Sequence, residues 1–185
     1  MTNRALLALV LCSLLLGVRA VSARQGDARL EPLFEQLAGA DSVQQAETMV
    51  REIWGIWYES GDADIDDLMA RGMVAMNAGR FDVARRFFDE VIEADPDFAE
   101  GWNKRATVHW LMDNLEESMD DIQRTLALEP RHFGAASGMG LIFMQRGDKD
   151  GALRAFQQVL KINPSDTGAI RRVEKLQRLV DEEAV

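Results

Sequence analysis

Apolar residues recur along most of this chain at the three- and four-residue spacing of helices that bury one face. The pattern repeats three times with a period of 34 residues. Such a period predicts an array of helix pairs, because each pair is too small to bury its own apolar face and must stack on a neighbour. The recurring positions are Gly72, Ala106 and Gly140, then Ala84, Ser118 and Ala152, then Phe88, Ile122 and Phe156, then Pro96, Pro130 and Pro164.

Turn residues divide each period into two helices, A and B. In the first unit, helix A is predicted over about 65–78 and helix B over about 81–94. A proline ends every helix B, because it cannot donate the backbone hydrogen bond that a continuing helix needs. The three units therefore cover about 65–98, 99–132 and 133–166, and their short loops hold neighbouring helices antiparallel.

Small side chains at the repeating positions let helix A and helix B approach closely. The large residue four positions farther along helix B, Phe88 in the first unit, then fills the space between consecutive units. These features resemble the tetratricopeptide-repeat (TPR) family, whose motif combines such residues with a closing proline on the same period. The resemblance implies an all-α, right-handed α-solenoid of three helix hairpins. The overall pattern is similar to secreted bacterial TPR proteins of unassigned role.

The first residues predict export. Residues 1–23 combine a basic start, an apolar run and small residues at cleavage spacing, which is typical of a secretory signal peptide ending at Ala20 or Ala23. The expected location is the periplasm of a Gram-negative envelope. The apolar run is too short for a comfortable bilayer crossing, so no membrane span is expected after cleavage.

Helical patterns also flank the repeats. Residues 24–62 are predicted to form a degenerate helical pair that caps the array by covering the first repeat. The array itself is assigned to residues 63–185, and its last helix, over 167–183, is expected to cap the C-terminal end with a polar outer face.

In the TPR family, the inner faces of the A helices line a concave groove that binds peptides or partner helices. The resemblance implies a groove that is rich in methionine and has a polar rim. Its predicted partner-binding residues are Met69, Met73, Met76, Asn103, Thr107, Trp110, Leu111, Leu141 and Met144. The same helix face also carries Asp66, Glu100, Gly134 and Ser137.

Some TPR proteins clamp the acidic C-terminal tails of heat-shock chaperones with lysine and asparagine side chains at five positions. Those positions hold Met69, Met73, Lys104, Gly134 and Gly138 in this sequence. Only Lys104 could serve, so the resemblance implies that the clamp is absent.

Composition narrows the function further. The formal net charge of −10 argues against nucleic acid and anionic membrane surfaces as partners. No matched acid, base and nucleophile set and no metal-ligand spacing occurs, so the sequence predicts a protein that is not an enzyme and needs no cofactor or metal. Of the two histidines, His109 takes a packing position in helix A, and His132 lies in an inter-repeat turn where exposure is expected.

The predicted function is a protein–protein interaction scaffold or adaptor of the cell envelope. One alternative is a structural protein whose N-terminal segment, with Trp54, Trp57 and Tyr58, fills the groove or pairs with a second copy. Another is an assembly factor in a periplasmic maturation pathway. The oligomeric state stays open.

Overall fold

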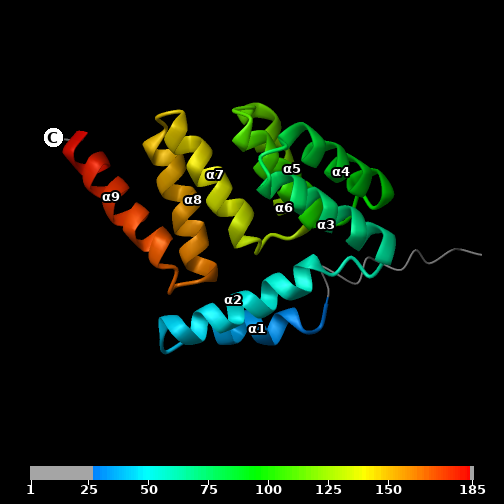
Figure 1. Ribbon diagram of the computed structural model, residues 1–185. Helices are drawn as coiled ribbons and strands as arrows, with labels where there is room; N and C mark the ends of the chain where they lie inside the picture. Colours follow the sequence, from blue (N-terminus) through cyan, green and yellow to red (C-terminus); the bar gives the residue numbers. More distant parts are fainter. Residues whose placement is uncertain (1–26, 184–185) are drawn as a thin grey trace, which may run out of the picture.

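The computed structural model describes residues 27–183, so the predicted signal peptide lies outside the described residues. Within 27–183 the chain is helical, without strands, which confirms the predicted all-α helical-repeat fold (Figure 1). The helices are α1 (Leu30–Ala38), α2 (Val43–Tyr58), α3 (Ala63–Asn77), α4 (Phe81–Ala94), α5 (Ala99–Leu111), α6 (Leu115–Leu128), α7 (Phe133–Gln145), α8 (Lys149–Ile162) and α9 (Thr167–Glu183).

The three A-to-B turns repeat the same backbone geometry. Gly79, Asp113 and Gly147 stand 34 residues apart and have φ values of 70°, 63° and 75°. Glycine adopts this left-handed conformation without steric cost, and aspartate is among the side chains that tolerate it. The next amide N–H donates to the carbonyl five residues earlier, at 2.9 Å in all three turns. Each A helix therefore ends in the same hydrogen-bonded motif, which reverses the chain.

Close contact between the A and B helices follows from the predicted small residues. A Cβ atom added to Gly72 would lie 2.5 Å from the Phe88 ring, and one added to Gly140 would lie 2.7 Å from the Phe156 ring. The second repeat differs, because its Ser118 hydroxyl donates to the carbonyl oxygen of Ala106 at 2.8 Å. Small size at these positions therefore fixes the spacing within the hairpins.

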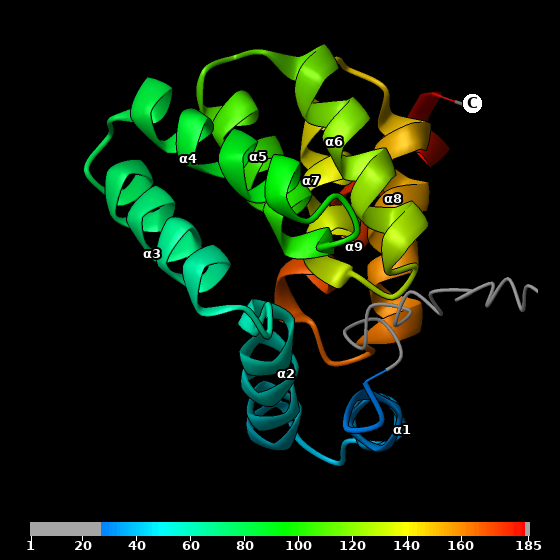
Figure 2. The ribbon, with the colours of Figure 1, turned by 90° about the vertical axis from the view of Figure 1, so that its right-hand side faces the viewer.

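The α1–α2 hairpin does not cover the first repeat, so that part of the prediction is wrong. Its residues Leu37, Ile53 and Trp57 share a core with Phe133 and Phe156 of the third repeat. Figures 1 and 2 show the hairpin lying beneath α7 and α8, on the side from which α3 starts. The physical reason is that α2 ends in aromatic side chains that pack against rings at the start of α7.

The C-terminal end of the array is covered by α9, which packs along α8 and buries Ala169 and Leu176 in the same core. Its outward positions carry charged side chains such as Arg171 and Lys175, as predicted from the sequence. No helix within residues 27–183 combines the length and apolar character needed to cross a bilayer.

Two helical glycines give a matched test of the packing. We expect Gly140→Ala to lower the free energy of unfolding by about 1–3 kcal/mol, because the added methyl group overpacks the site against Phe156. Gly55→Ala, at an exposed position in α2 with no side chain within 4 Å of the new methyl, should instead raise it by up to about 1 kcal/mol. Urea denaturation followed by circular dichroism measures both changes. Equal effects at the two glycines would contradict the packing role of Gly140.

Candidate partner-binding site

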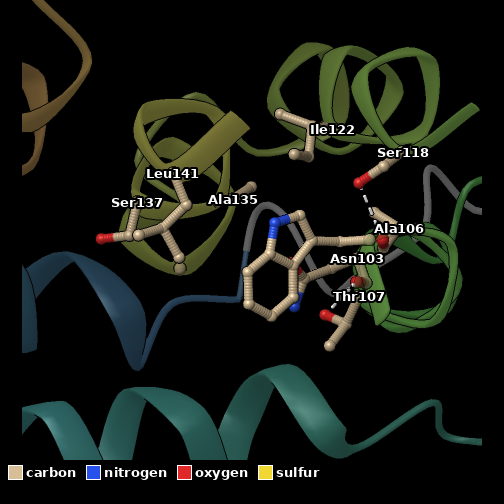
Figure 3. Close-up of a pocket in the computed structure, with 11 residues that line it drawn as sticks. Asn103, Ala106, Thr107, Ser118, Ile122, Ala135, Ser137 and Leu141 are labelled. Atoms are coloured by element: carbon tan, nitrogen blue, oxygen red, sulfur yellow. Dashed lines mark hydrogen bonds between the residues drawn. The ribbon is translucent and has the colours of Figure 1, made fainter. Parts of the chain in front are cut away.

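The candidate site is a pocket of about 210 Å³ on the concave side of the second and third repeats, between α5 and α7. Figure 3 shows Asn103 and Thr107 on the α5 side, with Ser137 and Leu141 facing them from α7. The lining residues are Asn103, Ala106, Thr107, Trp110, Ser118, Ile122, Gly134, Ala135, Ser137, Gly138 and Leu141.

Small residues on α7 create the space. Gly134, Ser137 and Gly138 lie on the side of α7 that faces α5, and none of them has a side chain long enough to fill the gap. A Cβ atom added to Gly138 would already lie 3.2 Å from Ile122. The two A helices therefore approach the floor of the pocket closely and still leave it open.

Most polar side chains of the pocket bond to their own surroundings. The Thr107 hydroxyl donates to the Asn103 carbonyl oxygen at 3.0 Å, and the Asn103 amide donates to the Glu100 carboxylate at 3.0 Å. Ser118 donates to the backbone of α5, as the dashed line in Figure 3 shows. Their hydrogen-bonding capacity is largely used, so the pocket offers mainly apolar surface to an incoming group.

The structure gathers only some of the predicted groove residues. Asn103, Thr107, Trp110 and Leu141 line the pocket, and Trp110 keeps 38% of its surface exposed. The remaining five predicted residues lie outside its lining: Met69, Met73, Met76, Leu111 and Met144.

The methionines of the first repeat have a structural role. Met69 is only 2% exposed and belongs to the core of the first repeat, and Met73 and Met76 pack against that core half-buried. Leu111 and Met144 stay exposed near the ends of α5 and α7. The methionine-rich floor inferred from the sequence is therefore reduced to a short pocket with one tryptophan at its rim.

A buried carboxylate lies at the closed end of the groove. Glu100, near the start of α5, is 1% exposed. Its Oε2 accepts hydrogen bonds from Asn103 Nδ2 and from His132 Nε2, each at 3.0 Å, and its Oε1 lies 3.0 Å from Lys104 Nζ. The sequence places Glu100 on the face of the groove, but in the structure it connects α5 to the loop before α7.

His132 is fully buried, so the expectation that this turn residue would be exposed is wrong. Its Nδ1 accepts the backbone N–H of Ala135 at 3.0 Å and thereby caps the start of α7. The proton of the neutral ring is therefore on Nε2, which donates to Glu100. The ring also stacks on Trp57 of α2, with centroids 4.2 Å apart and planes inclined by 8°. Its two nitrogens and its face are used by three different elements.

The charges in this cluster support one another. Burial raises the pKa of Glu100, but the His132 hydrogen bond and the Lys104 charge outweigh it and leave the pKa below its ordinary value. Burial lowers the pKa of Lys104, but the Glu100 charge and contact with Tyr58 outweigh it and leave that pKa raised. Both groups are therefore charged at neutral pH, as expected for a buried and hydrogen-bonded pair.

Helix α2 fills one end of the concave face. A Cβ atom added to Gly134 would lie 2.8 Å from the Trp54 ring, so this indole occupies the space beside the start of α7. Trp54 stacks on Tyr58, and Lys104 Nζ lies 5.2 Å and 4.9 Å from the centroids of these two rings. The groove is therefore partly self-filled by the aromatic segment and open only farther along α5 and α7.

Comparison with known proteins agrees with this architecture. Sequence models described as "Tetratricopeptide repeat" match residues 69–124 and 134–166. A TPR repeat-containing protein of Rhizobium etli is 40% identical over 148 residues, a match that spans 80% of this chain and 72% of that protein. The chain belongs to the tetratricopeptide-repeat family.

More distant TPR proteins share shorter regions. The DnaJ homolog subfamily C member 3 of Mus musculus is 29% identical over 105 residues, which cover 57% of this chain and 21% of that protein. The TPR domain of Sgt2 from Aspergillus fumigatus superposes with a TM-score of 0.62 at 20% identity, over 66% of this chain and 83% of that one. The first TPR of Spaghetti (RPAP3), solved with an HSP90 peptide, gives 0.61 at 19% identity, over 65% and 96%. At these identities, the solved structures show a common fold.

Sequence reasoning missed several lining residues of this TPR pocket. The repeat pattern assigns Ala106, Ser118 and Ile122 only to packing between helices, but they also line the pocket. It does not assign Ala135 and Gly138 to the groove. The run of small residues over 134–138 was the available signal, since a helix face without bulky side chains leaves space beside a neighbouring helix. Within residues 27–183, no group of three or more histidine, cysteine or acidic side chains is placed to hold a metal ion.

The buried cluster makes a testable prediction for stability. At pH 7, Glu100→Gln should lower the free energy of unfolding by about 3 kcal/mol, because it leaves the largely buried Lys104 charge without its counter-ion. The pKa of Glu100 is lower in the folded chain than its ordinary 4.5, so its contribution is fully present above that pH and disappears as the pH falls through the lower folded value. Urea denaturation at pH 7 and at pH 3 measures the gap between wild type and variant, which should shrink at acid pH.

Glu47→Gln, at an exposed position of α2, is the matched control and should change the stability at neither pH. A gap for Glu100→Gln that stays constant between pH 7 and pH 3 would contradict this account of the cluster.

Proposed function

We propose that this TPR protein is a non-enzymatic interaction scaffold that holds an apolar segment of a partner protein in the pocket between α5 and α7. The observation that carries the proposal is the open pocket itself, in which Trp110 remains 38% exposed beside Leu141. A half-exposed tryptophan at the edge of an apolar cavity is the type of residue that contributes most of the binding energy at protein interfaces.

The chemistry of the pocket favours an apolar anchor. Thr107, Ser118 and Asn103 direct their hydrogen bonds toward the protein, so a polar ligand group would lose its hydration without gaining equivalent partners. The volume of about 210 Å³ suits one aliphatic or aromatic side chain with part of its flanking backbone. The main determinant of recognition would thus be a single apolar residue in an extended or helical partner segment.

Acidic tails are disfavoured as ligands. TPR domains of RPAP3 have been solved with HSP90 and HSP70 peptides that end in EVD. In this chain, Lys104 is paired with Glu100 and covered by Trp54 and Tyr58, so it is not available to a ligand carboxylate. The negative net charge adds repulsion at long range.

We further propose that the scaffold acts in the bacterial cell envelope, as an adaptor or assembly factor. The support for this location is the signal-peptide pattern of residues 1–23. Cell fractionation of the producing bacterium tests the location separately from the binding, because a cytoplasmic protein could still use the same pocket.

Site-specific photocrosslinking in the producing cell tests the groove and requires no purified partner. A photoreactive amino acid at Ser137, inside the pocket, should capture a protein that mass spectrometry can identify. The same amino acid at Val43, on an exposed position of α2 away from the pocket, is the control. Identical products from both positions would argue against a specific groove.

Binding of the captured partner should depend on one aromatic side chain. We expect Trp110→Ala to weaken the affinity by about 2 kcal/mol, or roughly 30-fold, while the unfolding midpoint stays close to that of wild type. Leu111→Ala is the control, because this neighbour is similarly exposed at 41% and does not line the pocket. Isothermal titration calorimetry measures both affinities, and equal losses for the two variants would speak against the pocket.

A further inference from the structure

The two ends of the TPR array differ in how they are covered. Val74, Val108 and Ile142 occupy the same position in three successive A helices, 34 residues apart. Val108 and Ile142 are fully buried, whereas Val74 is 63% exposed. The same side-chain position is therefore inside a helix–helix junction in the second and third repeats and open to solvent in the first.

The internal junctions show what such a position is built to contact. Val108 lies in the core of the first repeat with Phe88 and Val91, so the preceding hairpin covers it. One turn earlier, Arg105 reaches back from α5 to Asp89 of α4, with Nη1 2.9 Å from Oδ1. The junction between the first two repeats thus combines a buried aliphatic side chain with an arginine–aspartate pair across the hairpins.

The first repeat presents the same combination without a hairpin to cover it. Arg71, the counterpart of Arg105, lies 4.6 Å from the Phe87 ring centroid, and it forms an ion pair with Asp67 on its own helix, at 3.4 Å. A shallow concavity of about 360 Å³ lies there, lined by Ala70, Arg71, Val74, Arg80, Val83 and Phe87. We refer to these six residues as the free end face.

Within residues 27–183, no other part of the chain covers this face. The α1–α2 hairpin is held beneath the third repeat by the Trp57–His132 stack, and the opposite end of the array is covered by α9 (Figures 1 and 2). The surface that matches a TPR stacking face is therefore the free end face of another molecule.

We propose that two copies of this protein associate through their free end faces, around a two-fold axis that brings α3 and α4 of one copy against those of the other. The face is apolar at Val74, Val83 and Phe87, and its edges carry both signs of charge, with exposed Arg71 and Arg80 near exposed Asp67. A two-fold axis places the basic edge of each copy against the acidic side chains of its partner. This local mixture of signs allows close approach although the chain as a whole is acidic.

Sedimentation velocity of the purified protein over a range from 1 to 500 µM, as a practical span on the order of typical weak dimers, tests the proposal. The wild type should pass from monomer to dimer within this range and form no larger species. Val74→Glu should raise the dimer dissociation constant at least tenfold, because it places two carboxylates in the contact. Since Val74 is mostly exposed in the single chain, the variant should retain the wild-type circular dichroism and unfolding midpoint.

Val43→Glu is the matched control, because this valine of α2 is 45% exposed and distant from the free end face, and the dimer should tolerate the change. A wild type that stays monomeric at the highest concentration would overturn the proposal. So would a dimer that survives Val74→Glu, or one abolished by Trp110→Ala, since the latter would place the contact in the partner-binding pocket. Growth into longer oligomers would exclude the two-fold arrangement.

Discussion

The arrangement of this TPR protein depends on one buried carboxylate. Glu100 would be costly to bury alone, but it accepts hydrogen bonds from Asn103 and His132 and pairs with Lys104. These contacts hold His132 in the orientation in which its second nitrogen caps α7 and its face receives Trp57. A single ionised group thus links the second repeat, the third repeat and the N-terminal hairpin.

That link sets the length of the open groove. Because Trp57 is held against His132, its neighbour Trp54 lies over Gly134 and closes the end of the concave face near the starts of α5 and α7. Lys104, the one clamp-position residue that could have bound a ligand carboxylate, is enclosed by the same aromatic side chains. The contacts that stabilise the N-terminal hairpin therefore also direct recognition toward apolar groups and confine it to the pocket beside Trp110.

The repeat period was sufficient to predict the local structure. It located the A-to-B turns at Gly79 and Gly147, the ends of the B helices before their prolines, and the close contacts of Gly72 and Gly140 with aromatic rings. These features depend on residues within one repeat, so sequence spacing reports them directly. The concave position of Asn103, Thr107, Trp110 and Leu141 was predicted for the same reason, whereas their role in binding stays a prediction.

The sequence by itself determined the helix pairs, their order and the small-residue contacts, because each of these follows from spacing along one or two helices. Only the tertiary structure decided that His132 is buried, that Met69 belongs to the core, and that the N-terminal hairpin leaves the first repeat uncovered. These outcomes depend on contacts between residues far apart in the chain, such as Trp57 with His132. A periodic pattern shows which face of a helix is apolar, but it does not show which of several apolar surfaces that face will cover.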